Sequence, residues 1–349
     1  MSQARRGFSL IELLVVIFII IVIVSITIPA LAGARKSARK AETQMTLTTL
    51  GNAVSQFETD HNGTAPGYFS AREMGRQENA TRGFTAMQNI LLDLSGGLTT
   101  GTGASTVLVG PTAADAVRID QSLIGTTSGG GKLYFSINRK NFYPQDGTQG
   151  ARTGVPEHQY PELVDAFGTP IVAWVQDPTF TKAPAVVTDF AREDSGTAAA
   201  TTPSRFYWAS NAAFFTSGVR IGKRGVDNGA VSMLGSDVGP ADRVRSLTGL
   251  LGSPGSALNM TQAGVTYDTL WPSAARAGVV LHSAGEDGAF LPKLVGGSPT
   301  VKDAGTGQCY NGIMDFGQNF LDPQAGNAPL PASVDLAKKF NDIIVGAGT

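Results

Sequence analysis

The sequence predicts an α+β fold in which one long N-terminal helix, membrane-spanning in its first half, packs on a C-terminal antiparallel β-sheet head with large loop insertions. Three patterns predict it. An almost uninterrupted apolar run covers Phe8–Ile28. The segment after it has apolar residues three and four positions apart, which is typical of an amphipathic helix. Beyond residue 62, short runs rich in aromatic and β-branched residues alternate with Gly-rich breaks.

The apolar run is long enough to span a membrane. At about 1.5 Å per residue, a helix over Phe8–Ile28 matches the roughly 30 Å hydrocarbon core of a bilayer. Ala30–Asp60 continues it as an amphipathic helix, and Asn62-Gly63 with Pro66 predicts its end near residue 61. The apolar stripe consists of Leu47, Leu50, Val54, Phe57 and His61.

The charge distribution argues against nucleic-acid binding. Of 27 basic and 28 acidic residues, the first 41 positions hold six basic residues and one acid, Glu12, so the remainder has a net charge of −6. An acidic body without a basic stripe lacks the electrostatic footprint of a nucleic-acid binder. Cys309 is the single cysteine, which excludes an intrachain disulfide.

Three interpretations of the N-terminus compete. Ala30-Leu31-Ala32 is a plausible signal-peptidase site, so the chain could be a secreted enzyme or binding protein released after Ala32. A plain membrane anchor is the second interpretation, although Arg35, Lys36, Arg39 and Lys40 would then place the head in the cytoplasm by the positive-inside rule. Neither interpretation gives a role to Glu12, an acidic residue inside an apolar run.

The third interpretation gives Glu12 a role in assembly. If the chain is cut after Gly7, Phe8 becomes the N-terminus and Glu12 becomes the fifth residue. A charged residue in a bilayer costs on the order of a few kcal/mol. An amine from a neighbouring subunit would lower that cost, and the pair would set the axial register between subunits, as a buried polar residue does in a coiled coil.

These residues resemble a known family. "RRG" followed by "FSLIELLVVI" is similar to the leader and N-terminal helix of type IV prepilins, which include type IV pilins and type II secretion pseudopilins. The resemblance implies that prepilin peptidase cleaves after Gly7 and methylates Phe8. It also implies that Glu12 acts in assembly and that Pro29 bends the helix, which would give a pilin-like fold.

Shorter segments resemble the major pseudopilins of type II secretion. "FETDHNGTAPG", Phe57–Gly67, is similar to their helix exit, and "LVDAFGTPIVAW", Leu163–Trp174, is similar to a turn and strand motif. "SAGEDG", Ser283–Gly288, resembles a late loop that often binds calcium, so Glu286, Asp287 and Asp303 are candidate calcium ligands. Paired C-terminal cysteines, present in many pilins, are missing.

The head is predicted from weaker patterns. Thr85–Leu94 is expected to be an amphipathic helix, and Ala332–Val345 a final short helix. The strand candidates are Lys132–Ile137, Thr169–Gln176, Ala185–Asp189, Arg205–Ala209 with Ala212–Thr216, and Val279–Ser283.

The sequence therefore predicts four segments: a leader at residues 1–7, a transmembrane and filament-core helix at 8–31, its amphipathic continuation at 32–61, and a pilin-like head at 62–349. We expect a non-enzymatic structural subunit of a type II secretion pseudopilus or type IV pilus-like filament. Its expected partners are prepilin peptidase, copies of itself and other pseudopilins, an inner-membrane assembly platform and membrane lipid. The expected location is the inner membrane, single-pass with the head outside the cytoplasm, and then a periplasmic or cell-surface filament.

Overall fold

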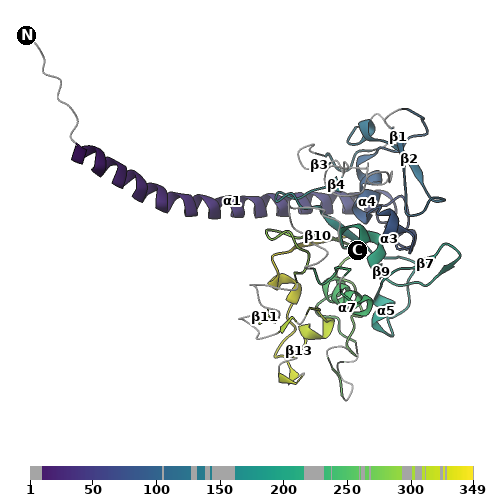
Figure 1. Ribbon diagram of the computed structural model, residues 1–349. Helices are drawn as coiled ribbons and strands as arrows, with labels where there is room; N and C mark the ends of the chain where they lie inside the picture. Colours follow the sequence, from purple (N-terminus) through teal and green to yellow (C-terminus); the bar gives the residue numbers. More distant parts are fainter. Residues whose placement is uncertain are drawn as a thin grey trace, which may run out of the picture.

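The chain consists of a long N-terminal helix and a head packed around the second half of that helix (Figure 1). The computed structural model describes residues 10–103, 106–126, 132–137, 142–143, 162–215, 232–236, 238–258, 260, 264–266, 269–292, 301–302, 309–310, 312–322, 325–326 and 328–348. The long N-terminal helix and the antiparallel sheet confirm the predicted α+β, pilin-like architecture.

Helix α1, Leu10–Asp60, is a single helix of 51 residues that continues through Pro29. Residues 10–41 are exposed, and the buried face begins at Thr43 and includes Leu47, Leu50 and Val54. The helix ends as predicted, because Asn62 and Gly63 adopt left-handed backbone conformations with φ of 55° and 81°. The Gly63 N–H then donates to the Glu58 carbonyl oxygen at 2.7 Å, which closes the last turn.

The central sheet has three antiparallel strands in the order β15–β10–β5, which are Ile343–Ala347, Val279–Ser283 and Val172–Val175. Both faces are covered, so side chains alternate between two cores along each strand. Val279 and Leu281 pack with α1 and with α4, Ala86–Ser95, whereas Val280 packs on the opposite core with α7, Pro240–Leu251. The sheet therefore joins the second half of α1 to the rest of the head.

Short elements complete the described head. The other helices are α2 (Ala71–Met74), α3 (Asn79–Arg82) and α5 (Val187–Phe190), with 3₁₀ turns η1 (Gln121–Leu123), η6 (Trp208–Phe214), η8 (Phe316–Asn319) and η10 (Leu336–Lys339). The antiparallel pairs are β1 (Thr106–Val109) with β2 (Val117–Asp120), β3 (Phe142–Tyr143) with β4 (Glu162–Leu163), β7 (Gly196–Thr197) with β8 (Ala200–Thr201), β11 (Val301–Lys302) with β12 (Cys309–Tyr310), and β13 (Leu321–Asp322) with β14 (Ala328–Pro329). Strands β6 (Ala191–Arg192) and β9 (Phe206–Tyr207) pair in parallel.

Several predicted elements are confirmed. Strand β5 lies within the predicted strand Thr169–Gln176. Strand β10 coincides with the predicted strand Val279–Ser283. Helix α4 matches Thr85–Leu94 closely because Thr85 caps it, with its side chain accepting from the Gln88 N–H.

Other predictions were wrong, and tertiary contacts explain why. Lys132–Ile137 is irregular, since the Tyr134 and Phe135 N–H groups both donate to the Leu94 carbonyl oxygen at the end of α4. Ala185–Asp189 is not a strand; it leads into α5, with the Ala185 N–H donating to Asp189 Oδ2 at 2.9 Å.

The remaining errors concern the chain around η6 and the C-terminus. Within Arg205–Ala209 only β9 is extended, and Ala212–Thr216 begins in η6 rather than in a strand, with Thr216 outside the described residues. Ala332–Val345 is not a helix. It forms η10 and then enters β15, because the β-branched run at 343–345 pairs with β10.

Candidate functional site: the exposed helix and its junction with the head

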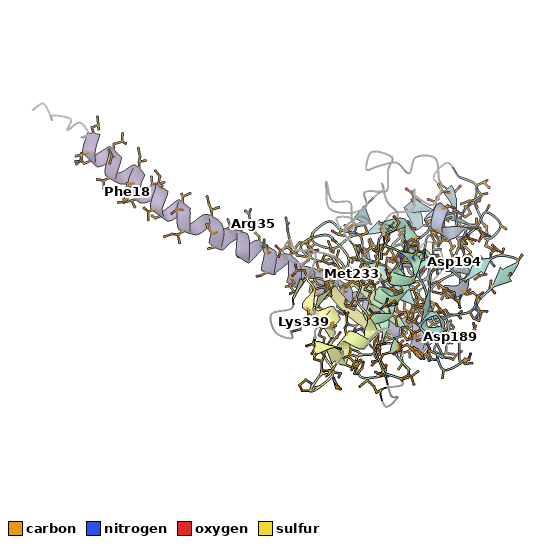
Figure 2. The ribbon with its side chains drawn as sticks, turned by 60° about the horizontal axis from the view of Figure 1, so that its bottom comes forward. Phe18, Arg35, Asp189, Asp194, Met233 and Lys339 are labelled. Atoms are coloured by element: carbon orange, nitrogen blue, oxygen red, sulfur yellow. The ribbon has the colours of Figure 1, made fainter. Side chains whose placement is uncertain are left out.

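The first half of α1 projects from the head as an apolar rod. Figure 2 shows Phe18 on this rod, far from Asp189 and Asp194 on the opposite side of the head. The helix is long and apolar enough to cross a membrane, and none of that stretch is buried. Large side chains from Leu10 to Ile28 are between 41% and 82% exposed. Such a surface requires lipid or other protein around it.

Two hydroxyl groups in the rod form hydrogen bonds within the helix. Ser25 Oγ donates to the Val22 carbonyl oxygen at 2.8 Å, and Thr27 Oγ1 donates to the Ile23 carbonyl oxygen at 2.7 Å. Because these hydroxyl protons already have acceptors, the rod can enter an apolar environment without losing those hydrogen bonds.

The predicted processing and assembly residues lie at the start of this rod. Glu12 is exposed in the first turn of α1, and Pro29 lies inside the helix, which Figure 1 shows curving over its exposed half. Gly7 and Phe8 lie outside the described residues, so the cleavage and methylation sites stay predictions.

A turn at Asp165 contacts α1 where the buried face of the helix begins, at the junction between rod and head. Its carboxylate Oδ1 accepts from the N–H groups of Phe167 and Thr169 at 2.8 and 2.9 Å. Gly168 takes a left-handed φ of 86° and donates to the Asp165 carbonyl oxygen at 3.0 Å. This geometry confirms the turn predicted from "LVDAFGTP" and places it at the start of β5.

Two of the three sequence segments that resemble pseudopilin motifs, Leu163–Trp174 and Ser283–Gly288, meet at this turn. Ser283, the last residue of β10, donates its hydroxyl to Asp165 Oδ2 at 2.6 Å. The Ala166 N–H donates to Thr43 Oγ1 of α1 at 3.2 Å. Burial raises the pKa of Asp165, and the hydrogen bond from Ser283 and the backbone N–H groups partly offset that rise. The turn therefore joins α1, β5 and β10.

An ion pair links the rod to the loop after β10. Lys36 Nζ contacts Glu286 Oε1, and both side chains are about half exposed. Beside this pair, a cavity of about 110 Å³ is lined by residues of α1 and of the head, including Lys36, Lys40, Phe167 and Glu286. The sequence pattern gave no signal for this pairing, since the partners are far apart in the chain.

The candidate calcium ligands form no cation site with the residues described. Glu286 is paired with Lys36, and Asp287 Oδ1 accepts from the Ala289 N–H at 3.0 Å while Oδ2 lies 3.5 Å from Asn341 Nδ2. Within the described part of the chain, no group of three or more His, Cys, Asp or Glu side chains is arranged to hold a metal ion. Asp303 lies outside that part, so the three-residue set stays a prediction.

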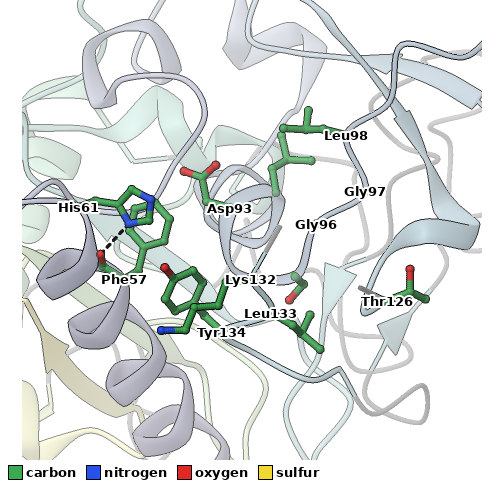
Figure 3. Close-up of a pocket in the computed structure, with 12 residues that line it drawn as sticks. Phe57, His61, Asp93, Gly96, Gly97, Leu98, Thr126, Lys132, Leu133 and Tyr134 are labelled. Atoms are coloured by element: carbon green, nitrogen blue, oxygen red, sulfur yellow. Dashed lines mark hydrogen bonds between the residues drawn. The ribbon is translucent and has the colours of Figure 1, made fainter. Parts of the chain in front are cut away.

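A larger cavity of about 460 Å³ lies at the far end of α1 (Figure 3). Its wall includes Phe57, His61 and Tyr134, whose rings pack together; the Phe57 and His61 rings stack with centroids 3.9 Å apart. Asp93 faces it, and Asp93 Oδ2 accepts from the Gly67 N–H at 2.7 Å. These contacts hold the chain against the C-terminal end of α1, and we assign the cavity no chemistry.

A comparison with known protein families finds a match at the N-terminus of the chain. The signature described as the prokaryotic N-terminal methylation motif matches residues 2–28. No curated protein and no solved structure shows significant similarity to the chain. The matched motif and the exposed apolar helix together support a type IV prepilin-like protein, processed by prepilin peptidase and anchored in a membrane through α1.

Proposed function

We propose that the chain is a structural subunit of a filament, a type II secretion pseudopilus in preference to a type IV pilus, and that it has no catalytic role. The observation that supports this most strongly is the exposed apolar rod with Glu12 in its first turn. A soluble enzyme has no use for such a rod once it is folded, whereas a filament subunit can bury it against its neighbours.

Assembly would move the rod from one apolar environment to another. Before assembly, lipid covers the exposed side chains of residues 10–31; in the filament, helices of other subunits cover them. Because both environments are apolar, the hydrophobic effect favours neither strongly, and extraction from the membrane needs an external machine. An inner-membrane assembly platform driven from the cytoplasm would supply it, with the head outside the cytoplasm.

Glu12 would fix the register of this packing. Cleavage after Gly7 creates an α-amine at Phe8, and the amine of one subunit would pair with Glu12 of another. Charges that are unpaired in an apolar core are costly, so only the axial register that joins them is favourable. In this proposal the first turn of α1 sets the axial position of each new subunit relative to its neighbours.

The preference for a secretion pseudopilus depends on the head. Its support is the helix exit at Asn62-Gly63, the turn at Asp165 and Gly168 that opens β5, and the contact of that turn with Ser283. The single Cys309 also separates the chain from pilins with a C-terminal disulfide. The head's large insertions are compatible with a specialised subunit.

The mature N-terminus tests the proposal directly. Mass spectrometry of the protein purified from membranes should find N-methylphenylalanine at Phe8 as the first residue. A first residue at Gly33 would instead identify an ordinary signal peptide cleaved after Ala32, and the filament proposal would be rejected. In cells that lack prepilin peptidase, the protein should keep residues 1–7, which provides the control.

A further inference from the structure

We propose that the head binds anionic phospholipid headgroups beside the base of the rod while α1 is inserted in a bilayer. The surface comprises Arg35, Lys36, Arg39 and Lys40 of α1 together with Lys338 of η10, and we call it the basic collar. Lys36 is paired with Glu286, so the excess positive charge of the collar comes from its other members. Figure 2 shows Arg35 on the rod close to the head, and Lys339, the neighbour of Lys338, on the side of the head that faces the rod.

The collar lies at the depth of the lipid headgroups. Residues 13–34 contain no charged side chain, and 22 helical residues span about 33 Å, close to the thickness of a bilayer's hydrocarbon core. Arg35 is the next residue, and Lys40 follows within about 8 Å along the helix axis. The helical part of the collar therefore falls within the headgroup layer when the apolar segment is inserted.

The head completes the collar with a groove. A groove of about 410 Å³ is lined by Lys40 and Gln44 of α1 and by Arg276, Lys338 and Asp342 of the head. The Asp342 carboxylate is hydrogen-bonded to His282 in the interior of the head. Arg276 is neutralised by Asp335 through two hydrogen bonds of 2.6 and 2.9 Å. Lys338 is 80% exposed and lies 3.9 Å from the same carboxylate.

The free charge in this groove comes mainly from Lys40. Lys40 is exposed, and among the residues that the structure describes it forms no ion pair. Lys40, Lys338 and Arg276 outnumber the carboxylates of Asp335 and Asp342, so the groove keeps an excess of positive charge. Lysine is a common point-charge partner of phosphate. A phosphodiester headgroup fits both the charge and the depth of this site.

Charge complementarity favours lipid over other partners. From Glu42 onward the chain has a net charge of −6, so an anionic membrane repels most of the head. The collar is the basic surface next to the membrane-spanning segment, and electrostatic attraction acts only within about one Debye length, roughly 8–10 Å. Headgroup binding would therefore fix how the head stands on the membrane before assembly.

Spin-labelled lipids test this inference on the full chain reconstituted in phosphatidylcholine vesicles. The fraction of motionally restricted lipid gives the association constant of phosphatidylglycerol relative to phosphatidylcholine. Since a basic residue near an anionic surface changes association by about fivefold, we expect a preference of at least fivefold in the native chain. The Lys40→Gln/Lys338→Gln variant should lose most of it, as should the native chain in about 0.5 M salt.

The control is Lys182→Gln, an exposed lysine a few residues before α5 in the chain. Figure 2 places Asp189, which belongs to α5, on the side of the head away from the rod. This variant should keep the native preference. If the double variant is misfolded by circular dichroism, Lys338→Gln alone gives the test, because its side chain is exposed.

Equal association of both lipids with the native chain would overturn the inference, as would a double variant with native lipid preference. Loss of self-association in the double variant without a change in lipid preference would assign the collar to a second copy instead, and would also overturn it. The test requires only that α1 is inserted in a bilayer, so its failure leaves the filament proposal intact.

Discussion

Glu12 is the residue on which the assembly proposal depends. It is an exposed acidic residue in the first turn of a helix whose next 22 residues are uncharged. We expect Glu12→Ala and Glu12→Val to leave processing and membrane insertion intact but to reduce filament yield by at least tenfold, because the amine of Phe8 then lacks its partner, at a cost of a few kcal/mol per subunit. Sheared filaments and membrane fractions quantify the two outcomes.

Ser25→Ala is the matched control for Glu12. Ser25 is exposed on the same rod, but its hydroxyl already donates to the Val22 carbonyl oxygen, so its removal should leave filament yield unchanged. Native yield from Glu12→Val would show that no intersubunit pair sets the register.

Asp93 makes the stability of the head depend on pH. Burial raises the pKa of this carboxyl above its ordinary value of 3.8, partly offset by the hydrogen bond from the Gly67 N–H. The folded state therefore favours the protonated form, so its contribution is fully present below pH 3.8 and is lost as the pH rises through the raised pKa. Asp93→Asn should stabilise the head at pH 7 and have little effect at pH 3.5, as measured by urea unfolding followed by tryptophan fluorescence.

Asp60 provides a control of opposite sign. Hydrogen bonds from Lys132 and Tyr134 lower the pKa of Asp60, so its contribution is present above pH 3.8 and is lost as the pH falls through the lowered pKa. Asp60→Asn should therefore weaken the head at pH 7, and only slightly because solvent screens this exposed group. For Asp93, the raised pKa would be contradicted if the free energy of unfolding of Asp93→Asn changed with pH in the same way as that of the native chain.

Elements with local signals were predicted correctly. The end of α1 needed only the left-handed preference of Asn62-Gly63, and α4 needed only a capping threonine and a helical repeat. Helix α7 was missed, although Pro240 at its first turn and an apolar repeat through Val244, Leu247 and Leu251 are helix signals in the sequence.

Strand β15 could not be predicted from its own residues. The sequence from Ala332 to Val345 has helical spacing, but Ile343–Ala347 is recruited as a strand by pairing with β10, some 60 residues earlier. Burial against α1 on one face completes it, with Ile343 and Ala347 in the same core as Leu50 and Val54. Tertiary pairing outweighed local propensity at this element.

Gly51 marks the close packing of α1 on β15. A Cβ atom at this position would lie 3.5 Å from Ala347 Cβ and 3.6 Å from Val345 Cγ1, which is ordinary contact. Gly51→Ala should therefore raise the free energy of unfolding by about 0.5–1 kcal/mol through helix propensity. Gly51→Leu should lower it by about 1–3 kcal/mol through overpacking. Urea unfolding in detergent measures both, and destabilisation by alanine would show that the two elements are closer than described.

At the scale of the whole molecule, the apolar end of α1 is easier to recognise in the sequence than the junction with the head. Glu12, Pro29 and the apolar run are contiguous, so their pattern was visible in one segment. The junction combines Thr43 with Ala166 and Asp165 with Ser283, pairs that are 123 and 118 positions apart. Their types, a threonine, an aspartate and a serine, carry no mutual signal before folding brings them together.

The rod and the head should be separable in stability, which a pair of truncations can test. A chain that begins at Arg35 lacks only exposed residues of α1 and keeps Lys36, Thr43 and the whole buried face. We expect it to leave the membrane fraction and to retain the free energy of unfolding of the full chain within about 0.5 kcal/mol.

A second truncation, which begins at Leu50, removes Thr43 and the fully buried Leu47 and should therefore behave differently. Loss of a buried leucine alone costs about 2–5 kcal/mol, and the Ala166 N–H also loses its acceptor. Thermal melts of both truncations compare the two losses. Equal destabilisation by the two would mean that the exposed half of α1 supports the head, and the rod would then be a structural part of the head rather than a surface reserved for lipid and neighbouring subunits.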